Sequence, residues 1–231
     1  MNKNSLRTLF CALIALFAMT SCDWGVQRSP NGRLVLVHDV SPSGALCLTL
    51  YHNSDSGKVE VMNVDHVGID TESDHGESLI FKEVTGPVHH VDDYTMISGK
   101  RSQCHNEANE YTYRLEDFDG NEVRLVVRLY NDGLAFRYET EALEGEVVTG
   151  EHTRYAFADG IKRWTQPYAV GYEDFYFPNT DGVAHNRRRH WNLPALFQPG
   201  DDTYVLLAEA NVLRDQCGAY LSNRDDASSY R

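Results

Sequence analysis

Carboxylate side chains are the residues of this sequence best suited to acid–base chemistry. Asp and Glu together number 34 among 231 residues. Glu173 and Asp174 are neighbours, and neighbours in a strand point to opposite faces. Glu209 lies in an apolar, strand-like stretch, where burial would raise the pKa of its carboxyl, although a buried structural Glu is the alternative. The sequence therefore offers single carboxylates without a motif that pairs them as acid and base.

Other catalytic motifs are missing from the sequence. The ten histidines show no metal-ligand spacing, and neither a Gly-rich phosphate loop nor a Gly-x-Ser-x-Gly elbow is present. The segment 117–122 has a partial likeness to a calcium loop, but strands flank it, which favours a hairpin turn. Chemistry of the aldose-epimerase type would need a His–Glu pair, for which His152, His185 and Glu209 are the candidates.

Aromatic residues gather in the region 164–191. The set comprises Trp164, Tyr168, Tyr172, Phe175, Tyr176, Phe177 and Trp191. Sugars stack their C–H faces on such rings, so carbohydrate binding is one interpretation. Core packing, or burial against a second domain, is the alternative. Pro167, Gly171 and Pro178 indicate loops, which favours a domain interface over the deep core.

A β-hairpin is the most strongly patterned element that could position these residues. Apolar residues alternate along 122–130, Asn131-Asp132-Gly133 is a turn sequence, and 134–139 returns with its own alternation. A strand around 111–115 precedes it through a turn at Asp119-Gly120. These segments predict consecutive antiparallel strands.

Further strands are expected on both sides of that hairpin. They cover 33–38, 46–51, 58–64, 78–84, 94–98, 147–157, 204–209 and 219–222. Helical periodicity and internal repeats are absent. The pattern predicts an all-β antiparallel sandwich.

The N-terminus reads as an export signal. Lys3 and Arg7 precede an apolar run at 9–19 that is too short for a membrane span. Met19-Thr20-Ser21-Cys22 is typical of a lipoprotein cleavage box. We expect a signal peptide at 1–21, a lipidated Cys22 with a tether at 22–31, and a folded domain at 32–231. An ordinary secretory signal is the alternative.

Charge and cysteine content narrow the possible partners. The net charge of −13 disfavours nucleic acid, and the basic run Arg187-Arg188-Arg189 is short and isolated. Cys47, Cys104 and Cys217 show no Cys-x-x-Cys spacing, and no disulfide can be assigned among them.

Several segments, in order, resemble the N-terminal domain of glycoside hydrolase family 97. They are Ser29–Arg33, Glu110–Arg114, Val126–Tyr138, Gly171–Tyr176 and Leu206–Leu221. The resemblance implies a galactose-mutarotase-like β-super-sandwich. It also implies that the chain stops before the catalytic (β/α)₈ barrel and is inactive by itself.

The same resemblance implies a function and a cofactor. Family members are calcium-dependent exo-acting α-glucosidases or α-galactosidases, and Glu173 is the position onto which a calcium ligand of the N-terminal domain is carried. Calcium takes six to eight oxygens, so Glu173 would bind it only together with barrel carboxylates. The alternatives are a stand-alone surface lipoprotein that binds glycan through the aromatic residues, and an aldose-epimerase-like enzyme. The expected location is the bacterial cell envelope, on the outer membrane or its periplasmic side.

Overall fold

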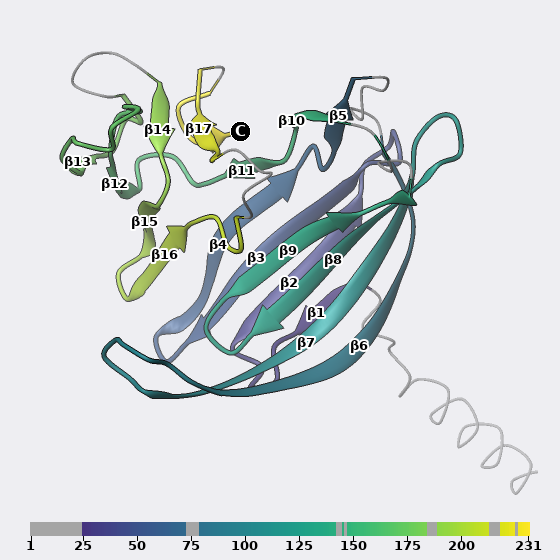
Figure 1. Cartoon of the computed structure of the whole chain (residues 1–231), viewed down its shortest axis with the longest axis horizontal. Helices are drawn as coiled ribbons and strands as arrows, with labels where there is room; N and C mark the ends of the chain where they lie inside the picture. The colour runs from purple at the N-terminus through teal and green to yellow at the C-terminus, as the bar shows by residue number, and fades with distance from the viewer. Residues whose placement is uncertain are drawn as a thin grey trace, which may run out of the picture.

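The computed structural model describes residues 25–72, 79–141, 145, 147–183, 189–212, 218–224 and 226–231. These residues form antiparallel strands and no α-helix (Figure 1). Within them, no helix is long and apolar enough to span a bilayer. The all-β prediction is therefore confirmed.

Two sheets form the body of the molecule (Figure 1). The first has the order β1-β2-β3-β4-β11-β18 and the second the order β6-β7-β8-β9. The first sheet contains β1 (Val26–Arg28), β2 (Leu34–Val40), β3 (Leu46–Ser54), β4 (Gly57–Asp65), β11 (Arg154–Ala156) and β18 (Ser229–Tyr230). The second contains β6 (Ile80–Thr95), β7 (Gln103–Glu116), β8 (Glu122–Tyr130) and β9 (Leu134–Glu139).

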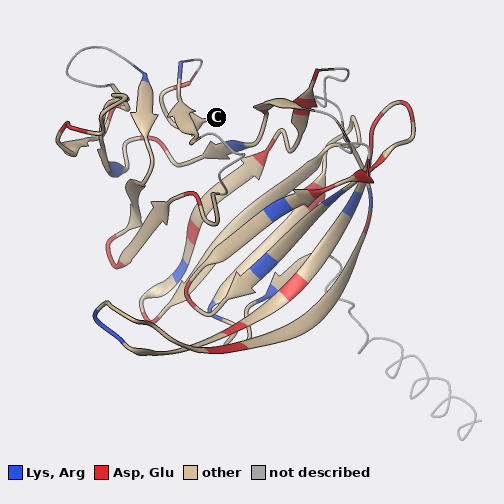
Figure 2. Ribbon diagram, in the orientation of Figure 1, with Lys and Arg blue, Asp and Glu red and all other residues tan. Residues whose placement is uncertain are grey.

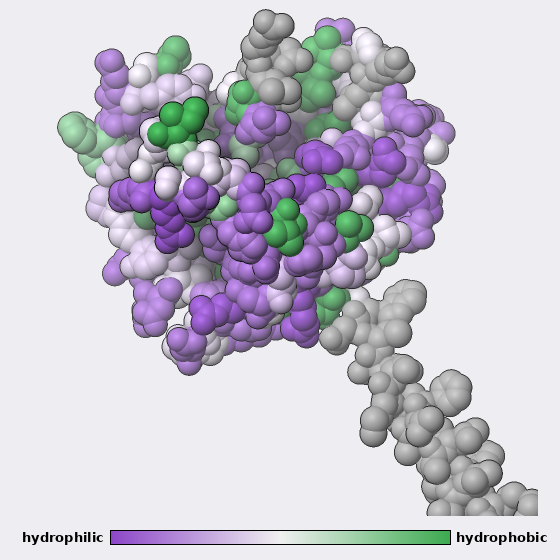
Figure 3. Space-filling model, turned by 60° about the horizontal axis from the view of Figure 1, so that its bottom comes forward, coloured by the Kyte–Doolittle hydropathy of each residue, from purple (hydrophilic) through white to green (hydrophobic). Residues whose placement is uncertain are grey.

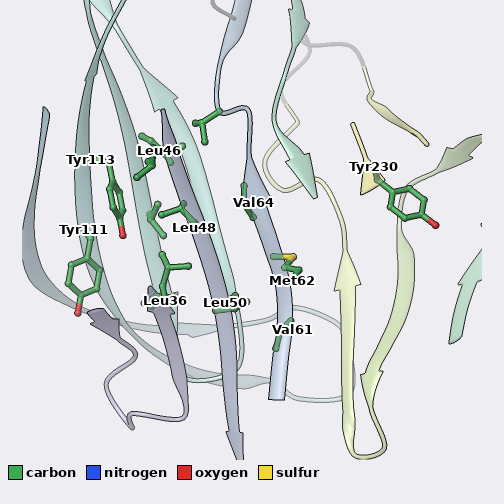
Figure 4. Packing of buried hydrophobic residues seen from close by; sticks show 14 of the residues in the cluster. Leu36, Leu46, Leu48, Leu50, Val61, Met62, Val64, Tyr111, Tyr113 and Tyr230 are labelled. Carbon is green, nitrogen blue, oxygen red and sulfur yellow. The ribbon is translucent and has the colours of Figure 1, made fainter. Parts of the chain in front are cut away.

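The hydrophobic core lies between these sheets. Leu36, Leu48 and Leu50 from the first sheet pack with Tyr113 and Leu125 from the second (Figure 4 shows part of this cluster). Alternation along β8 places its arginines outward and places these four apolar residues in the core: Val123, Leu125, Val127 and Leu129. The outward side chains pair with acidic neighbours, so basic and acidic residues lie side by side on this sheet (Figure 2).

The predicted hairpin is confirmed residue for residue. β8 and β9 have the predicted bounds, and the N–H of Tyr130 donates to the carbonyl of Gly133 at 2.8 Å. The segment 117–122 forms the turn between β7 and β8, in which Asp117 Oδ1 accepts the N–H groups of Asp119 and Asn121. The segment is therefore a hairpin turn, in which the Asp117 carboxylate binds backbone N–H groups.

Two predicted boundaries need correction. Val26–Arg28 of the expected tether pair with β2, and Gln27 is 5% exposed, so this part belongs to the domain. The segments predicted at 78–84 and 94–98 overlap one long strand, β6, which runs from Ile80 to Thr95 and pairs with β7, and Ser78 lies outside the described residues. The cis bond Gly86–Pro87 and the nearby register shift interrupt this strand without ending it.

A third group of short strands follows the two sheets. One sheet has the order β13-β12-β15-β16, and β14-β17 and β10-β5 form pairs. Their bounds are β5 (Ile69–Thr71), β10 (Val148–Glu151), β12 (Lys162–Thr165), β13 (Phe177–Asn179), β14 (His190–Asn192), β15 (Ala195–Gly200), β16 (Thr203–Leu207) and β17 (Tyr220–Ser222). The segment predicted at 147–157 therefore divides between β10 and β11.

The described cysteines, Cys47 and Cys104, are free thiols. Cys47 lies on β3, where burial raises the pKa of its thiol and the nearby carboxylates of Asp65 and Asp39 raise it further. A thiol with a raised pKa is a poor nucleophile at neutral pH. Cys22, His185 and Cys217 lie outside the described residues.

Candidate functional site

One face of the sheet β13-β12-β15-β16 carries exposed apolar side chains. In register, Trp164 lies opposite both Pro178 and Leu196, and Leu196 lies opposite Leu206. Tyr204 shares the face, with its ring centroid 6.3 Å from that of Trp164. Leu206 and Tyr204 are 60% and 57% exposed. We call Trp164, Pro178, Leu196, Tyr204 and Leu206 the outer face.

This apolar face contrasts with the general character of the surface. On the side of the molecule shown in Figure 3, the surface is mostly hydrophilic and apolar residues form small separate patches. The opposite side of the same sheet is buried. Arg163, Ala195 and Phe197 alternate with the outer-face residues along their strands, so they point to that side, and each is 0% exposed. An exposed apolar face of this kind is typical of an interaction surface.

A loop between β12 and β13 carries the next group of predicted residues. Tyr172, Phe175 and Tyr176 are all exposed, and Tyr172 has a positive φ of 52°. The side-chain amide of Gln166 donates to the carbonyls of Tyr172 and Asp174 and so fixes the loop. The three aromatic side chains are therefore exposed on a loop whose backbone is held in place by hydrogen bonds from Gln166.

Glu173 lies at the exposed part of this loop. It forms no hydrogen bond or ion pair with any other described residue, and no group of three possible metal ligands occurs in the described part of the chain. A single carboxylate cannot complete the coordination of calcium. Calcium binding at Glu173 would therefore need oxygen ligands from outside the described residues.

The structure brings Tyr168 together with two residues that the sequence analysis did not identify. The rings of Tyr168 and Tyr220 have centroids 4.8 Å apart, and His190 stacks on Tyr220 at 5.0 Å. The pairing of β14 with β17 creates this contact. Because these strands are short and distant in sequence, no local pattern could have indicated it.

Trp191 is separated from the exposed rings. Its side chain is 1% exposed, and its indole N–H donates to Asn223 Oδ1 at 2.9 Å. Strand alternation explains the difference, since His190 on one side of β14 faces outward while Trp191 packs into the core. The aromatic residues predicted as one cluster therefore occupy separate places.

Two carboxylates lie near each other at the end of the small sheets. Glu209 Oε1 accepts the N–H of Ala219 at 3.0 Å, which ties the end of β16 to the start of β17. Burial raises the pKa of the Glu151 carboxyl, and the charge of Glu209 raises it further, while a hydrogen bond from Thr153 opposes the shift. Glu151 is exposed as a residue, but protein atoms pack around its carboxyl group. These atoms displace water from the carboxyl and so disfavour its charged form.

Of the residues considered for epimerase chemistry, the described ones, His152 and Glu209, do not form a His–Glu pair. His152 Nε2 lies 2.7 Å from Asp70 Oδ1, and both side chains are largely buried. Glu209 instead contacts the backbone at Ala219. The geometry therefore gives His152 a local carboxylate partner other than Glu209.

A pocket of about 380 Å³ lies between β13 and β14. Pro167, Phe177, Val183 and Trp191 contribute its apolar surface, and Thr180 and Asp181 contribute polar groups. Asp181 Oδ1 accepts the N–H of Val183 at 3.0 Å. No basic side chain of the described residues lines this pocket.

Solved structures with the same fold are sugar hydrolases. A β-arabinopyranosidase superposes with a TM-score of 0.75 and 23% identity, covering 89% of this chain and 34% of its own. A family 97 enzyme from Pseudoalteromonas sp. strain K8, solved with acarbose and with panose, gives a TM-score of 0.70 and 16% identity, covering 89% and 31%. The fold is thus that of a β-sandwich domain found in glycoside hydrolases.

The model of the family described as glycosyl-hydrolase 97 N-terminal matches residues 28–231. The chain therefore belongs to glycoside hydrolase family 97 and corresponds to its N-terminal domain. It spans about a third of the length of the solved structures. A search among curated proteins gave no match.

Proposed function

We propose that this chain is the carbohydrate-facing N-terminal domain of a calcium-dependent, exo-acting glycoside hydrolase of the α-glucosidase or α-galactosidase type. The observation that carries the proposal is the family match over residues 28–231, in a chain that spans only a third of its solved relatives. The domain would support the active site of a (β/α)₈ barrel and would be inactive alone. Acarbose and panose, bound by the Pseudoalteromonas enzyme, support an α-glucosidic substrate.

The outer face is proposed to contact that barrel. Its side chains form a continuous row across neighbouring strands, and most of its members are aromatic or aliphatic. Burying such a row against a second domain would stabilise the contact by about 25 cal/mol per Å² of apolar surface. The envelope location and the lipid on Cys22 remain predictions from the N-terminal sequence.

Replacing Leu206 by Asp tests this contact. In the isolated chain, we expect a change in unfolding free energy within about 0.5 kcal/mol, because Leu206 is 60% exposed. In the complete protein, the same change should bury an unpaired charge and separate the domains. Limited proteolysis of the interdomain segment would measure this. Ile97→Asp is the matched control, since Ile97 is also exposed but lies at the far end of the β6–β7 hairpin. Equal proteolysis of both variants would contradict the interface.

Replacing Glu173 by Gln tests the calcium proposal. The neutral amide keeps the shape of the side chain and removes its charge, so we expect calcium affinity and turnover of the complete protein to fall at least about 10-fold. Isothermal titration with calcium and an assay on α-glucosides and α-galactosides, after chelation and calcium return, measure both quantities.

Asp174→Asn is the control for that experiment. Asp174 is the adjacent carboxylate, and its Oδ1 accepts the N–H of Phe175, a contact that Asn preserves. This variant should retain calcium binding. Unchanged affinity and turnover in Glu173→Gln would remove Glu173 from the site. A complete protein that hydrolyses neither substrate class with calcium would contradict the proposed function itself.

A further inference from the structure

We propose that the pocket between β13 and β14 binds one neutral pyranose ring, at a site that is separate from Glu173 and borders the outer face at Pro178. Phe177 and Asn179, which line the pocket, lie opposite the buried Thr165 and Arg163, and Pro178 is shared with the edge of the outer face. Its volume of about 380 Å³ is near the lower end of the range for ligand sites. One pyranose ring fits within that volume.

The walls of the pocket offer flat apolar surfaces. Phe177 is 36% exposed, and Pro167, Pro178, Val183 and Trp191 also contribute apolar surface to the lining. The C–H faces of a pyranose pack against such surfaces. Apolar walls with few polar groups are typical of sites that orient a small ligand.

The polar groups of the pocket select a hydroxylated ligand without negative charge. One oxygen of Asp181 accepts the Val183 N–H, and a carboxylate has further lone pairs with which to accept hydroxyl donors. The Thr180 hydroxyl can donate or accept. Among the described lining residues Asp181 is the one with a charged side chain, so a phosphate or carboxylate would be repelled by it.

The polar side of the pocket is preorganised. Asn179 Oδ1 accepts the N–H of Gly182 at 3.1 Å, and the buried guanidinium of Arg163 donates to the carbonyl of Thr180 at 3.3 Å. A loop fixed before binding loses little conformational entropy when the ligand arrives. Thr180 and Asp181 are therefore held in place in the free protein.

A cationic ring could also contact Asp181 and the aromatic walls. We choose a sugar over a cation because the proposed function of the whole protein concerns sugars, and this choice rests on that proposal. The pocket itself belongs entirely to this chain, so binding can be measured without the barrel.

The experiment is a titration of the mature chain followed by ¹H–¹⁵N NMR. The probes are methyl α-D-glucopyranoside and methyl α-D-galactopyranoside, with methyl glucuronide and choline chloride as charged comparisons. The indole N–H signals of the three tryptophans are assigned with Trp24→Phe and Trp164→Phe. We expect the Trp191 signal to shift with a Kd of about 1–10 mM for a neutral pyranoside. The Trp164 signal should shift less than the Trp191 signal, because Trp164 does not line the pocket.

The variants Asp181→Asn and Phe177→Ala test the contacts. Asn keeps the acceptor for Val183 N–H and loses the charge, so the Kd should rise at least about 10-fold. Asp202→Asn, an exposed carboxylate outside the pocket, should bind as the unchanged chain does. Preservation of the remaining spectrum shows that each variant is folded.

Three results would overturn the proposal. One is a Trp191 signal that stays fixed with both pyranosides up to about 100 mM, ten times the weakest expected Kd. Another is binding by Asp181→Asn and Phe177→Ala with the same Kd as the unchanged chain. The third is tighter binding of choline or the glucuronide. None of these results bears on hydrolysis by the complete protein, so failure of the pocket and failure of the proposed function are distinguishable.

Discussion

Replacing Arg163 by Ala is expected to lower the free energy of unfolding of the isolated chain by about 3–5 kcal/mol. The side chain is 0% exposed. Its guanidinium donates to the carbonyl of Ala227 at 2.8 Å, to the Tyr230 hydroxyl at 2.6 Å and to the carbonyl of Thr180 at 3.3 Å. Alanine would remove this donor from the Tyr230 hydroxyl and the Thr180 carbonyl and would leave a cavity, while the Ala227 carbonyl would keep its hydrogen bond from Asn223. Each buried acceptor that loses its partner costs about 1–3 kcal/mol.

Urea unfolding monitored by circular dichroism measures the loss, as a lower midpoint at an unchanged m-value. Lys162→Ala is the matched control, because Lys162 is the exposed neighbour on the same strand and should change stability by less than about 0.5 kcal/mol. Arg163→Lys should recover only part of the loss, since an ammonium cannot reproduce the planar fork. Arg163→Ala with near-unchanged stability would contradict this account.

Replacing Gly182 by Ala is expected to cost about 3–4 kcal/mol, the sum of backbone strain and a steric clash. Gly182 has a φ of 66°, a conformation that costs an L-residue about 1–2 kcal/mol. An added Cβ would collide with the carbonyl oxygen of Ala227 and lie 2.8 Å from both Arg163 Nη1 and Asn223 Nδ2. These atoms belong to the backbone or to buried hydrogen-bonded groups, so they cannot move aside without loss.

Gly160→Ala separates the two contributions. Gly160 has a similar φ of 71°, but an added Cβ there meets nothing within 4 Å. We therefore expect only the strain of about 1–2 kcal/mol in that variant. Thermal and urea unfolding of both variants give the difference, which is the steric part. Equal losses in the two variants would mean that the packing around Gly182 is looser than described.

Arg163 and Gly182 act at the same place, where the loop 179–183 meets the last strand. Asn223 donates from its side-chain amide to the carbonyls of Gly182 and Ala227. Tyr230, fully buried, packs its ring edge-on against Phe157 and Phe197. These contacts hold the polar side of the pocket in place. Arg163→Ala and Gly182→Ala should therefore also weaken the binding of any ligand there.

The first half of the chain could be predicted in detail because its strands are long and locally patterned. The segment 122–139 specifies alternation, turn and return strand within eighteen consecutive residues, and the structure reproduces those bounds. Strands β2, β3 and β4 were found for the same reason. A half-buried strand must alternate, so its pattern is present in the sequence itself.

The short strands of the second half were largely missed. β12, β13, β14 and β15 have three to six residues each, too few for periodicity to be recognised. Their pairing joins segments separated along the chain, as in β12 with β15. Such pairing depends on the packing of the whole domain and leaves no local pattern.

By itself, the sequence determined the all-β class, the central hairpin, the acidic surface and the resemblance to family 97, because each depends on composition or on neighbouring residues. The tertiary structure alone decided how the aromatic residues are used. Trp164 lies on an exposed sheet face, Tyr168 lies beside Tyr220, and Trp191 is buried. The physical reason is that the face on which a side chain lies is fixed by strand register, and register in short strands is set by distant partners.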